Sequence, residues 1–426
     1  MRLKFLGGCK QIGGQAVYLE NDGYYLFDYG IEMGKKPSLP ELDFSVRDLN
    51  VVFLTHAHLD HSGGVPYLFS GIKTPNLVMT PPTRILSKIL FRDMLKLSGY
   101  YLPFGQNEVR TALNRAIMVK YSKNKWKKMN GVKYLTIDAG HIPGSASFIV
   151  EVNGKRIMYT GDINHISTRL LDGMKNKFPK IDYVIMESTY GATDHPERET
   201  VEKELVEYIN NIIDQEGTVL VPAFGVGRSQ EVMCLCTYYN IRYPIFIDGM
   251  ARKVSRALMR YVNYLRDTSL YKKAIRITNF ISRGKKKIME RRNAVSMPSV
   301  IIAPSGMLKG GTAIFYADNL KDSVKNAIYL VSFQLPGSLG RQVLESKLWK
   351  DGNTKIKAEV KHFPLSSHSG RSELLSFVDT IDKKSNGNTT FFHIHGEEEN
   401  INAISNELVD RGIESIIPNK MEDFEI

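Results

Sequence analysis

The chain has 426 residues, which is too long for one ordinary hydrophobic core and indicates two domains or one composite domain. Hydrophobic residues make up 42% of the chain and charged residues 24%, which is typical of a folded globular protein. No apolar run is long enough for a signal peptide or a bilayer span, so we expect a cytoplasmic protein without a membrane partner. The net charge of +12 favours a polyanionic partner, because each neutralised phosphate releases condensed counterions.

The first half of the chain is predicted to form β-hairpins. Each hairpin joins two apolar segments through an Asn/Asp-Gly turn, whose residues tolerate the positive φ angles of tight turns. The pairs are residues 16–20 with 24–28, and 147–152 with 156–160. Residues 50–55 form a nearly all-apolar run that is typical of a buried strand.

From about residue 190 the sequence predicts strands that alternate with helices. The expected helices are residues 201–213 and a segment beginning near Ser229, and the expected strands are 217–222, 243–247, 299–303 and 327–332. This alternation indicates a parallel sheet with crossover helices. Only three cysteines occur, so a disulfide framework is not expected, and Cys234 and Cys236 are predicted to be buried.

After about residue 345 the chain is predicted to return to β-rich sequence, ending with a strand at 389–394. The simplest organisation is one domain interrupted by another. We predict boundaries at 1–190 for the first part of the outer domain, 191–342 for the inserted domain, and 343–426 for the C-terminal part of the outer domain.

The strongest chemical signal is a cluster of histidines and an aspartate directly after the buried strand. It reads Thr55-His56-Ala57-His58-Leu59-Asp60-His61, in a chain that has only 10 histidines. Imidazole and carboxylate are the ligands that zinc prefers when no thiolate is present. His56 and His58 can share one metal because alternate residues of an extended segment point the same way, and Asp60 and His61 then face a second position.

Three further candidate ligands lie in loops or at predicted strand ends. They are His141 in Gly140-His141-Ile142-Pro143-Gly144, Asp162 in Gly161-Asp162, and His395 directly after the last predicted strand. Taken alone, each is an ordinary loop or turn residue. Together with the first cluster they supply enough donors for two zinc ions.

This succession of motifs resembles the metallo-β-lactamase superfamily, whose first motif is matched by Asp28 in Leu26-Phe27-Asp28-Tyr29-Gly30. The resemblance implies an αββα sandwich and two Zn²⁺ ions per chain. It places one ion on His56, His58 and His141, the other on Asp60, His61 and His395, and Asp162 between them. Asp28 would orient the ligand histidines.

Three more segments resemble the β-CASP branch of this superfamily. They are Met186-Glu187-Ser188-Thr189-Tyr190-Gly191, Val226-Gly227-Arg228-Ser229-Gln230-Glu231, and Ser366-Ser367-His368-Ser369-Gly370. The chain is most similar in character to the nuclease subunit of the cleavage and polyadenylation specificity factor and its archaeal counterparts, in a short form without KH domains, with RNase J as a neighbouring relative. The resemblance implies an α/β inserted β-CASP domain with a mostly parallel sheet.

The resemblance also implies a reaction and its catalytic residues. RNA phosphodiester bonds would be hydrolysed by a hydroxide activated between two metals, leaving a 5′-phosphate and a 3′-hydroxyl. Asp60, Glu187 and His368 are the predicted catalytic residues, with His368 oriented by Glu187 as general acid. We expect endonucleolytic cutting in RNA 3′-end processing or decay, with 5′-to-3′ exonucleolytic cutting as a second mode.

The expected partners are single-stranded RNA, a second copy of the chain in a homodimer, and an RNA-processing complex. Candidate phosphate contacts are Ser145, Arg228, Ser305, Gly306 and Arg341. Basic runs at 123–128 and 283–292 could bind single strands, although a solvated charged face is the better explanation for each run taken alone.

Four other functions stay open at this stage. These are an RNase J-like 5′-to-3′ exoribonuclease, a DNA nuclease, a small-molecule hydrolase on the same scaffold, and a non-catalytic RNA-binding subunit. A small-molecule hydrolase would need neither the inserted domain nor the Glu187 and His368 pair. A non-catalytic subunit would not be expected to keep every ligand position filled.

Overall fold

A computed structural model describes residues 1–32, 36–122 and 125–426 and divides the chain into two compact units. Unit 1 comprises Met1–Ile166, Gly173–Asp194 and Ser367–Ile426, and unit 2 comprises Ser167–Asp172 and His195–Ser366. Two residues of the basic run 123–128, Lys123 and Asn124, lie outside the described residues.

Unit 1 contains two seven-stranded sheets. The first has the order β20-β1-β2-β3-β4-β5-β6, with β1 (Arg2–Gly7), β2 (Ala16–Glu20), β3 (Tyr24–Phe27), β4 (Leu49–Phe53), β5 (Asn76–Met79), β6 (Ala116–Met118) and β20 (Asp423–Glu425). The second has the order β19-β18-β11-β10-β9-β8-β7, with β7 (Lys127–Met129), β8 (Val132–Asp138), β9 (Ala146–Val152), β10 (Lys155–Tyr159), β11 (Tyr183–Glu187), β18 (Thr390–Ile394) and β19 (Ser415–Ile416). Both predicted hairpins are confirmed, as β2 with β3 and β9 with β10.

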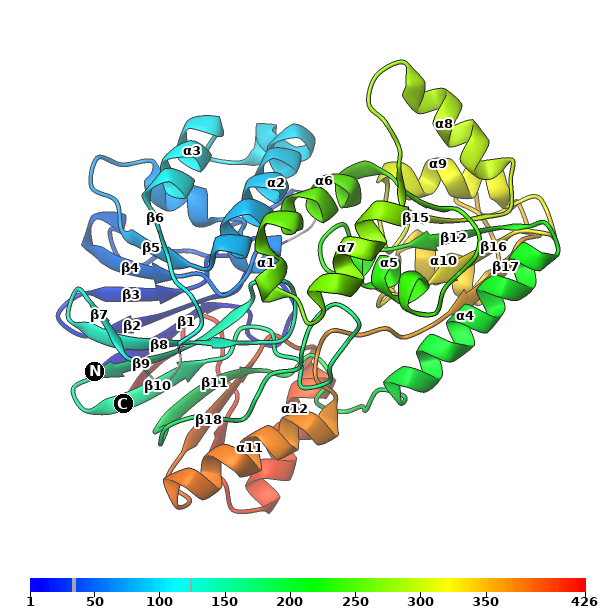
Figure 1. Ribbon diagram of the computed structural model, residues 1–426. Coiled ribbons are helices and arrows are strands. Elements are labelled where there is room, and N and C mark those ends of the chain that lie inside the picture. Colours follow the sequence, from blue (N-terminus) through cyan, green and yellow to red (C-terminus); the bar gives the residue numbers. More distant parts are fainter. Residues whose placement is uncertain (33–35, 123–124) are drawn as a thin grey trace. The chain divides into compact units, whose positions relative to one another are not determined.

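The two sheets face each other across an apolar core and carry helices on their outer faces (Figure 1). Aromatic side chains of both sheets meet in that core, with the ring centroids of Phe27 and Tyr159 5.2 Å apart. The first sheet packs against α2 (Pro81–Ser98) and α3 (Gln106–Arg115), and the second against α11 (Arg371–Ser385) and α12 (Glu398–Asp410). The short helices of this unit are α1 (Leu59–Ser62), η1 (Val46–Asp48), η2 (Val65–Phe69) and η3 (Gly99–Tyr101). This is the predicted αββα sandwich.

Helices α11 and α12 correct the prediction of β-rich sequence after residue 345. The apolar residues of α11 recur at helical spacing, with Leu374, Phe377, Val378 and Ile381 buried on one face. The Glu373 carboxylate accepts the backbone N–H of Gly370 and so satisfies a free donor where the helix begins. Likewise, α2 and α3 interrupt the first half, which was predicted as hairpins alone.

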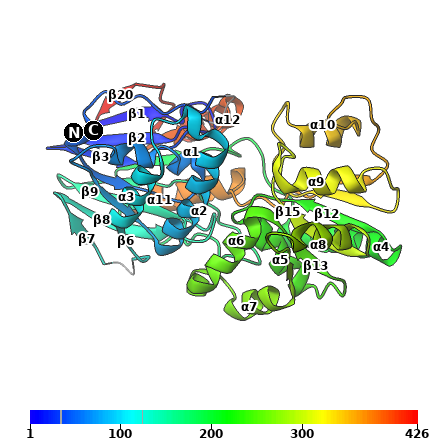
Figure 2. The same cartoon turned by 90° about the horizontal axis from the view of Figure 1, so that it is seen from above.

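Unit 2 is built around a six-stranded sheet with the order β14-β13-β15-β12-β16-β17, in which every pairing is parallel. Its strands are β12 (Thr218–Pro222), β13 (Ile245–Ile247), β14 (Asn279–Phe280), β15 (Ser299–Ala303), β16 (Ala327–Leu330) and β17 (Glu359–His362). Its helices are α4 (Arg198–Asp214), α5 (Arg228–Tyr238), α6 (Gly249–Leu258), η4 (Met259–Tyr264), α7 (Thr268–Ile277), α8 (Lys286–Val295), α9 (Gly311–Leu320) and α10 (Leu339–Ser346). Figure 2 shows these helices distributed about the sheet. Cys234 and Cys236 are buried in α5, as predicted.

The chain returns to unit 1 at Ser367, whereas the sequence-based boundary stood at residue 343. The reason is β17, which pairs with β16 from Ala327 opposite Glu359 to Leu330 opposite His362, and so holds this stretch in unit 2. The sequence Glu359-Val360-Lys361-His362 is too short and polar to be recognised as a strand of this sheet. Within the described residues, none of the helices has the length and apolar character needed to cross a membrane.

Candidate metal centre

The histidines and carboxylates of the site come from loops at the ends of strands in both sheets of unit 1. His56 and His58 follow β4, and Asp60 and His61 lie in α1, which begins at the next residue. Asp162 follows β10, Glu187 ends β11, and His395 follows β18. His141 lies in the loop between β8 and β9, and His368 in the loop before α11.

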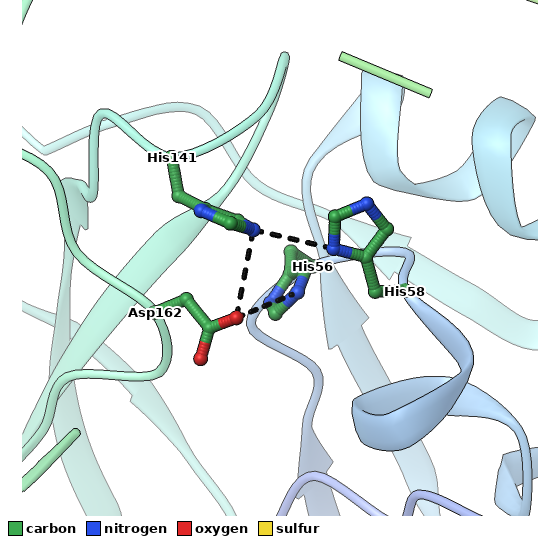
Figure 3. Close-up of side chains that lie close together, drawn as sticks. All are labelled: His56, His58, His141 and Asp162. Carbon is green, nitrogen blue, oxygen red and sulfur yellow. Dashed lines mark hydrogen bonds and ion pairs between the residues drawn. The ribbon is translucent and has the colours of Figure 1, made fainter. Parts of the chain in front are cut away.

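One group of side chains consists of three imidazoles and a carboxylate (Figure 3). The Nε2 atoms of His56 and His141 each lie 3.5 Å from Asp162 Oδ2. His141 Nε2 also lies 3.2 Å from His58 Nδ1. The ring atoms of three histidines therefore point at one small volume that Asp162 borders.

A second group shares Asp162 through its other oxygen. His61 Nε2 lies 3.1 Å and His395 Nδ1 3.3 Å from Asp162 Oδ1. Asp60 Oδ2 lies 3.4 Å from His395 Nε2 and 3.9 Å from His61 Nε2. The structure thus brings together all seven residues predicted as ligands, with Asp162 common to both groups.

Asp28 holds Thr55 and the cluster residue His61 in place through its carboxylate. It is fully buried, and its Oδ2 lies 2.7 Å from His61 Nδ1 and accepts a hydrogen bond of 2.8 Å from Thr55 Oγ1. Its Oδ1 accepts the backbone N–H of Thr55 at 2.7 Å. Because Nδ1 of His61 is held by this carboxylate, Nε2 is left to face the centre of the cluster.

The backbone conformation at Gly161 lets the loop that carries Asp162 lie against the loop that carries His56. A Cβ atom added at Gly161 would lie 2.7 Å from the Thr55 side chain, and the residue has φ +56°, so only glycine lets the Asp162 loop meet the His56 loop here. Asp28 and His395 also have left-handed φ values, of 56° and 52°. Such conformations are uncommon for residues other than glycine and are concentrated at functional sites.

The electrostatics favour neutral imidazoles on one side of the cluster. Burial lowers the pKa of His56, His58 and His141, so these rings are neutral and have a free lone pair near neutral pH. Burial would also lower the pKa of His61, but the carboxylates of Asp162, Asp60 and Asp28 raise it above its ordinary value.

The donor set fits a bound cation. His56 Nε2, His61 Nε2 and Asp162 Oδ1 are buried and make no well-oriented hydrogen bond among the described residues, even though His61 Nε2 lies 3.1 Å from Asp162 Oδ1. A buried polar atom left in this state costs about 1–3 kcal/mol. A cation that takes the lone pairs of these atoms removes that cost, and three or four nitrogen and carboxylate donors are typical of a zinc site.

His368 and Glu187 lie beside the cluster as a pair. His368 Nδ1 lies 2.8 Å and 3.0 Å from the two carboxylate oxygens of Glu187, and His368 Nε2 lies 3.9 Å from Asp162 Oδ2. Burial opposes protonation of His368, but Glu187, Asp162 and Asp60 outweigh it and raise the pKa of His368 to about 9. Glu187 also accepts the backbone N–H of Ile163 at 2.6 Å, which fixes its position.

Comparison with known proteins identifies the family. Residues 18–188 match a metallo-β-lactamase superfamily domain, residues 230–343 a β-CASP domain, and residues 353–418 a Zn-dependent metallo-hydrolase RNA specificity domain. The chain is 33% identical over its whole length to the whole of "Probable RNase MJ4" of Methanocaldococcus jannaschii. The chain belongs to the β-CASP family of the metallo-β-lactamase superfamily.

Two other relatives support this assignment to the β-CASP family. The chain is 33% identical to "RNase aCSPSF2" of Saccharolobus solfataricus, with all of this chain and 85% of the relative covered. It is also 33% identical to "Transcription termination factor FttA" of M. jannaschii, with 93% of this chain and 67% of the relative covered. The family and the cluster of donors together indicate a metal cofactor.

The residues predicted to contact phosphate are divided between the two units, with Ser145 in unit 1 beside the metal centre. Ser145 is buried beneath it, and its Oγ accepts the backbone N–H groups of His141 and Ile142, so it shapes the ligand loop. Arg228, Ser305, Gly306 and Arg341 belong to unit 2. Arg341 is exposed on α10 and pairs with Glu345 at 2.5 Å.

Several supporting residues were missed from the sequence. The Thr189 hydroxyl lies 3.0 Å from His395 Nδ1, and the Ser367 carbonyl oxygen lies 2.8 Å from His141 Nδ1. Thr55 binds Asp28 and also lies 3.1 Å from His56 Nδ1 through its Oγ1. Thr55 and Thr189 are adjacent in sequence to recognised motif residues, so their supporting roles could have been suspected. The contact of Ser367 is made by its backbone carbonyl, which every residue type has, so the sequence could not indicate it.

Proposed function

We propose that this β-CASP protein is a zinc-dependent ribonuclease that hydrolyses RNA phosphodiester bonds in 3′-end processing or RNA decay. The observation that carries the proposal is the convergence of seven ligand-type side chains beside the Glu187–His368 pair. The names of two relatives include RNase, and a third is a transcription termination factor, which supports RNA as the substrate class.

His56, His58 and His141 would hold one zinc ion, Asp60, His61 and His395 the other, and Asp162 would contribute an oxygen to each. When bound, two such cations supply Lewis acidity toward a phosphodiester and a water of lowered pKa near neutral pH. Asp28 keeps the His61 ring oriented, because its carboxylate accepts from Nδ1.

His368 would deliver a proton to the leaving 3′ oxygen. The Glu187 carboxylate holds Nδ1–H, so the protonated ring presents Nε2–H toward the cluster, where the scissile bond must lie. Glu187 acts through His368 and is therefore a positioning residue, whereas His368 is proposed to touch the reacting atoms.

The phosphate contacts proposed in unit 2 are Arg228, Ser305, Gly306 and Arg341. In support, the buried Ser332 Oγ and Gln334 Oε1 have no hydrogen-bond partner among the described residues. A Cβ added at Gly306 would lie 3.0 Å from Ser332 Oγ, so this hydroxyl borders the Gly306 backbone. Backbone N–H groups and a free hydroxyl are suited to phosphate oxygens.

The test compares a circular RNA with its linear 5′-monophosphate form, using zinc-loaded wild type and Asp162→Ala as the blank. Cutting of the circle by wild type alone establishes an endonuclease and supports the 3′-end-processing role. Loss of the linear form alone would make the protein a 5′-to-3′ exoribonuclease, as in RNase J. If neither RNA is cut by protein shown to contain zinc, the RNA assignment fails and DNA becomes the next substrate.

The alternative is a non-catalytic RNA-binding subunit. Protein that binds RNA without cutting it and retains no zinc after purification would favour this alternative. The homodimer and the RNA-processing complex stay predictions.

A further inference from the structure

The positive charge of the chain is concentrated in one segment of unit 2. Residues 248–292 contain fourteen lysines and arginines and three acidic residues, a net charge of +11 in a chain whose total is +12. The remainder of the protein is therefore nearly neutral. A surface of this kind attracts a polyanion to one region rather than to the whole molecule.

Part of this segment lies at the carboxyl end of the parallel sheet. Strands β13 and β14 pair in parallel at one side of the sheet, so the chain leaves both at the same edge. Helix α6 begins two residues after β13, and the loop 281–285 follows β14. In open parallel sheets, ligands bind at this edge.

The fold brings basic side chains from these two connections together. Arg252 of α6 donates to the backbone oxygen of Ile281, which anchors the loop to the helix. Burial lowers the pKa of Arg252, and the charges of Arg283 and Arg256 lower it further, because the three guanidinium groups lie close enough to repel one another. We call Arg252, Arg256, Arg283, Lys285 and Lys286 the edge patch.

The nearby acidic groups already have partners. Asp248 pairs with Arg291 at 2.6 Å and accepts from the Tyr316 hydroxyl. Glu290 accepts both the backbone N–H and the hydroxyl of Ser282. Four residues of the edge patch, Arg256, Arg283, Lys285 and Lys286, are exposed to solvent. Glu290 also interacts electrostatically with Lys286 and Arg252, but it is one carboxylate beside five basic residues, so the edge patch keeps a net positive charge that attracts anions.

The same edge carries exposed aromatic rings. Phe224 follows β12 and is 38% exposed, and Phe333 follows β16 and is 41% exposed. The guanidinium of Arg256 lies 5.1 Å from the centre of the Phe280 ring, beside the patch. Aromatic faces combined with a basic surface are typical of single-strand binding, because unpaired bases can stack while phosphates are neutralised.

We propose that the edge patch binds the phosphate backbone of single-stranded RNA and anchors the substrate on unit 2. The proposal rests on the proposed function for its choice of RNA. The Ser305 and Gly306 loop follows β15, which lies two strand spacings from β14, roughly 10 Å, so an anchored strand can continue toward this loop. Anchoring by charge makes affinity depend on salt, since each neutralised phosphate releases counterions.

The test measures binding of a fluorescent 30-nucleotide uridine RNA at several salt concentrations. All proteins carry Asp162→Ala so that the RNA is not cut. The patch variant combines Arg256→Gln, Arg283→Gln, Lys285→Gln and Lys286→Gln. The matched control removes four exposed charges of unit 1, by Lys73→Gln, Lys96→Gln, Arg110→Gln and Lys383→Gln. A third protein keeps the charge, with Arg256→Lys, Arg283→Lys, Lys285→Arg and Lys286→Arg.

We expect the patch variant to bind at least about tenfold more weakly and its slope of log affinity against log salt to fall by about 2 to 3, since each lost phosphate contact removes about 0.7. The control and the charge-retaining protein should keep both values within about twofold. An unchanged slope in the patch variant, or an equal loss in the control, overturns the proposal. Tighter binding of a duplex RNA overturns the choice of single strands, and patch-dependent binding to phosphatidylglycerol vesicles without RNA binding overturns the choice of RNA.

This test separates the two proposals. If wild type cuts RNA while the patch variant binds as wild type does, the edge patch fails alone. If wild type cuts no RNA but binding depends on the patch, the hydrolytic function fails and the surface assignment holds.

Discussion

His368 is the residue whose role is most open to direct chemical test. Its ring is held by Glu187 and faces Asp162, but it lies outside the seven proposed ligands. If it protonates the leaving oxygen, His368→Ala lowers kcat by about 10² to 10⁴-fold while zinc content, measured by plasma mass spectrometry, is unchanged.

A bridging 3′-phosphorothiolate at the scissile bond refines this prediction. A thiolate leaves without protonation, so His368→Ala should cut this substrate nearly as fast as wild type does, and Glu187→Gln should show the same rescue to a smaller degree. Equal losses on the oxygen and sulfur substrates would show that His368 holds structure or metal instead.

At the same scale, the clustering of the candidate ligands could be predicted because residue type and spacing carry the chemistry. His56, His58, Asp60 and His61 fall within six consecutive positions after a strand, and the fold then adds His141, Asp162 and His395 from other strand connections. The contacts that hold these rings in place could not be predicted in the same way. They depend on a hydroxyl such as that of Thr189, or on a carbonyl such as that of Ser367, meeting a histidine far away in sequence.

At the scale of elements, Glu231 of α5 contacts both α4 and the short segment Ser167–Asp172 of unit 2. Its carboxylate accepts from the Arg198 guanidinium of α4 at 2.7 Å and from the backbone N–H groups of Arg169 and Leu170 at 3.0 and 2.9 Å. Arg169 in turn donates to Glu202 of α4 at 2.6 Å. The short segment Ser167–Asp172 is therefore held in unit 2 by buried charges.

This network predicts how stability depends on pH. Burial would raise the pKa of Glu231, but Arg198 and the N–H donors lower it below the ordinary 4.5. Because the pKa is depressed in the folded state, the ionised carboxylate stabilises the fold fully above about pH 4.5, and this contribution is lost as the pH falls through the folded-state pKa.

Glu231→Gln should therefore lower the free energy of unfolding at pH 7 by about 3 kcal/mol, because Arg198 loses its buried partner. It should also flatten the decline in stability between pH 5 and 3. Urea unfolding across this range measures both effects, and Glu204→Gln on the exposed side of α4 is the control. A variant with the same stability as wild type at pH 7 would show that the network contributes nothing.

The strands of unit 2 were predicted well because parallel strands buried on both faces are continuous apolar runs, as in β12 and β15. Strand β17 was missed because its four residues are polar or half-buried, and only pairing with β16 defines it. The later helices α11 and α12 were missed although their apolar residues recur at helical spacing.

At the scale of the whole molecule, every residue of the metal centre belongs to unit 1. Removing the metal should therefore destabilise this unit selectively. A site that is saturated at a hundred times its Kd contributes about 2.7 kcal/mol, so the loss should be measurable even if one ion is removed.

Hydrogen exchange with mass spectrometry, with and without a chelator, can locate the effect. We expect faster exchange in peptides that contain His56, His141 and His395, because the side chains of all three meet at Asp162. Peptides covering β12 and β15 serve as the internal control, since their core of Leu220 and Ile301 contains no metal donor. Equal deprotection of both sets would mean that the cation stabilises the chain through something other than this cluster. Selective deprotection would tie the stability of the sandwich to the same ions that the proposed hydrolysis requires.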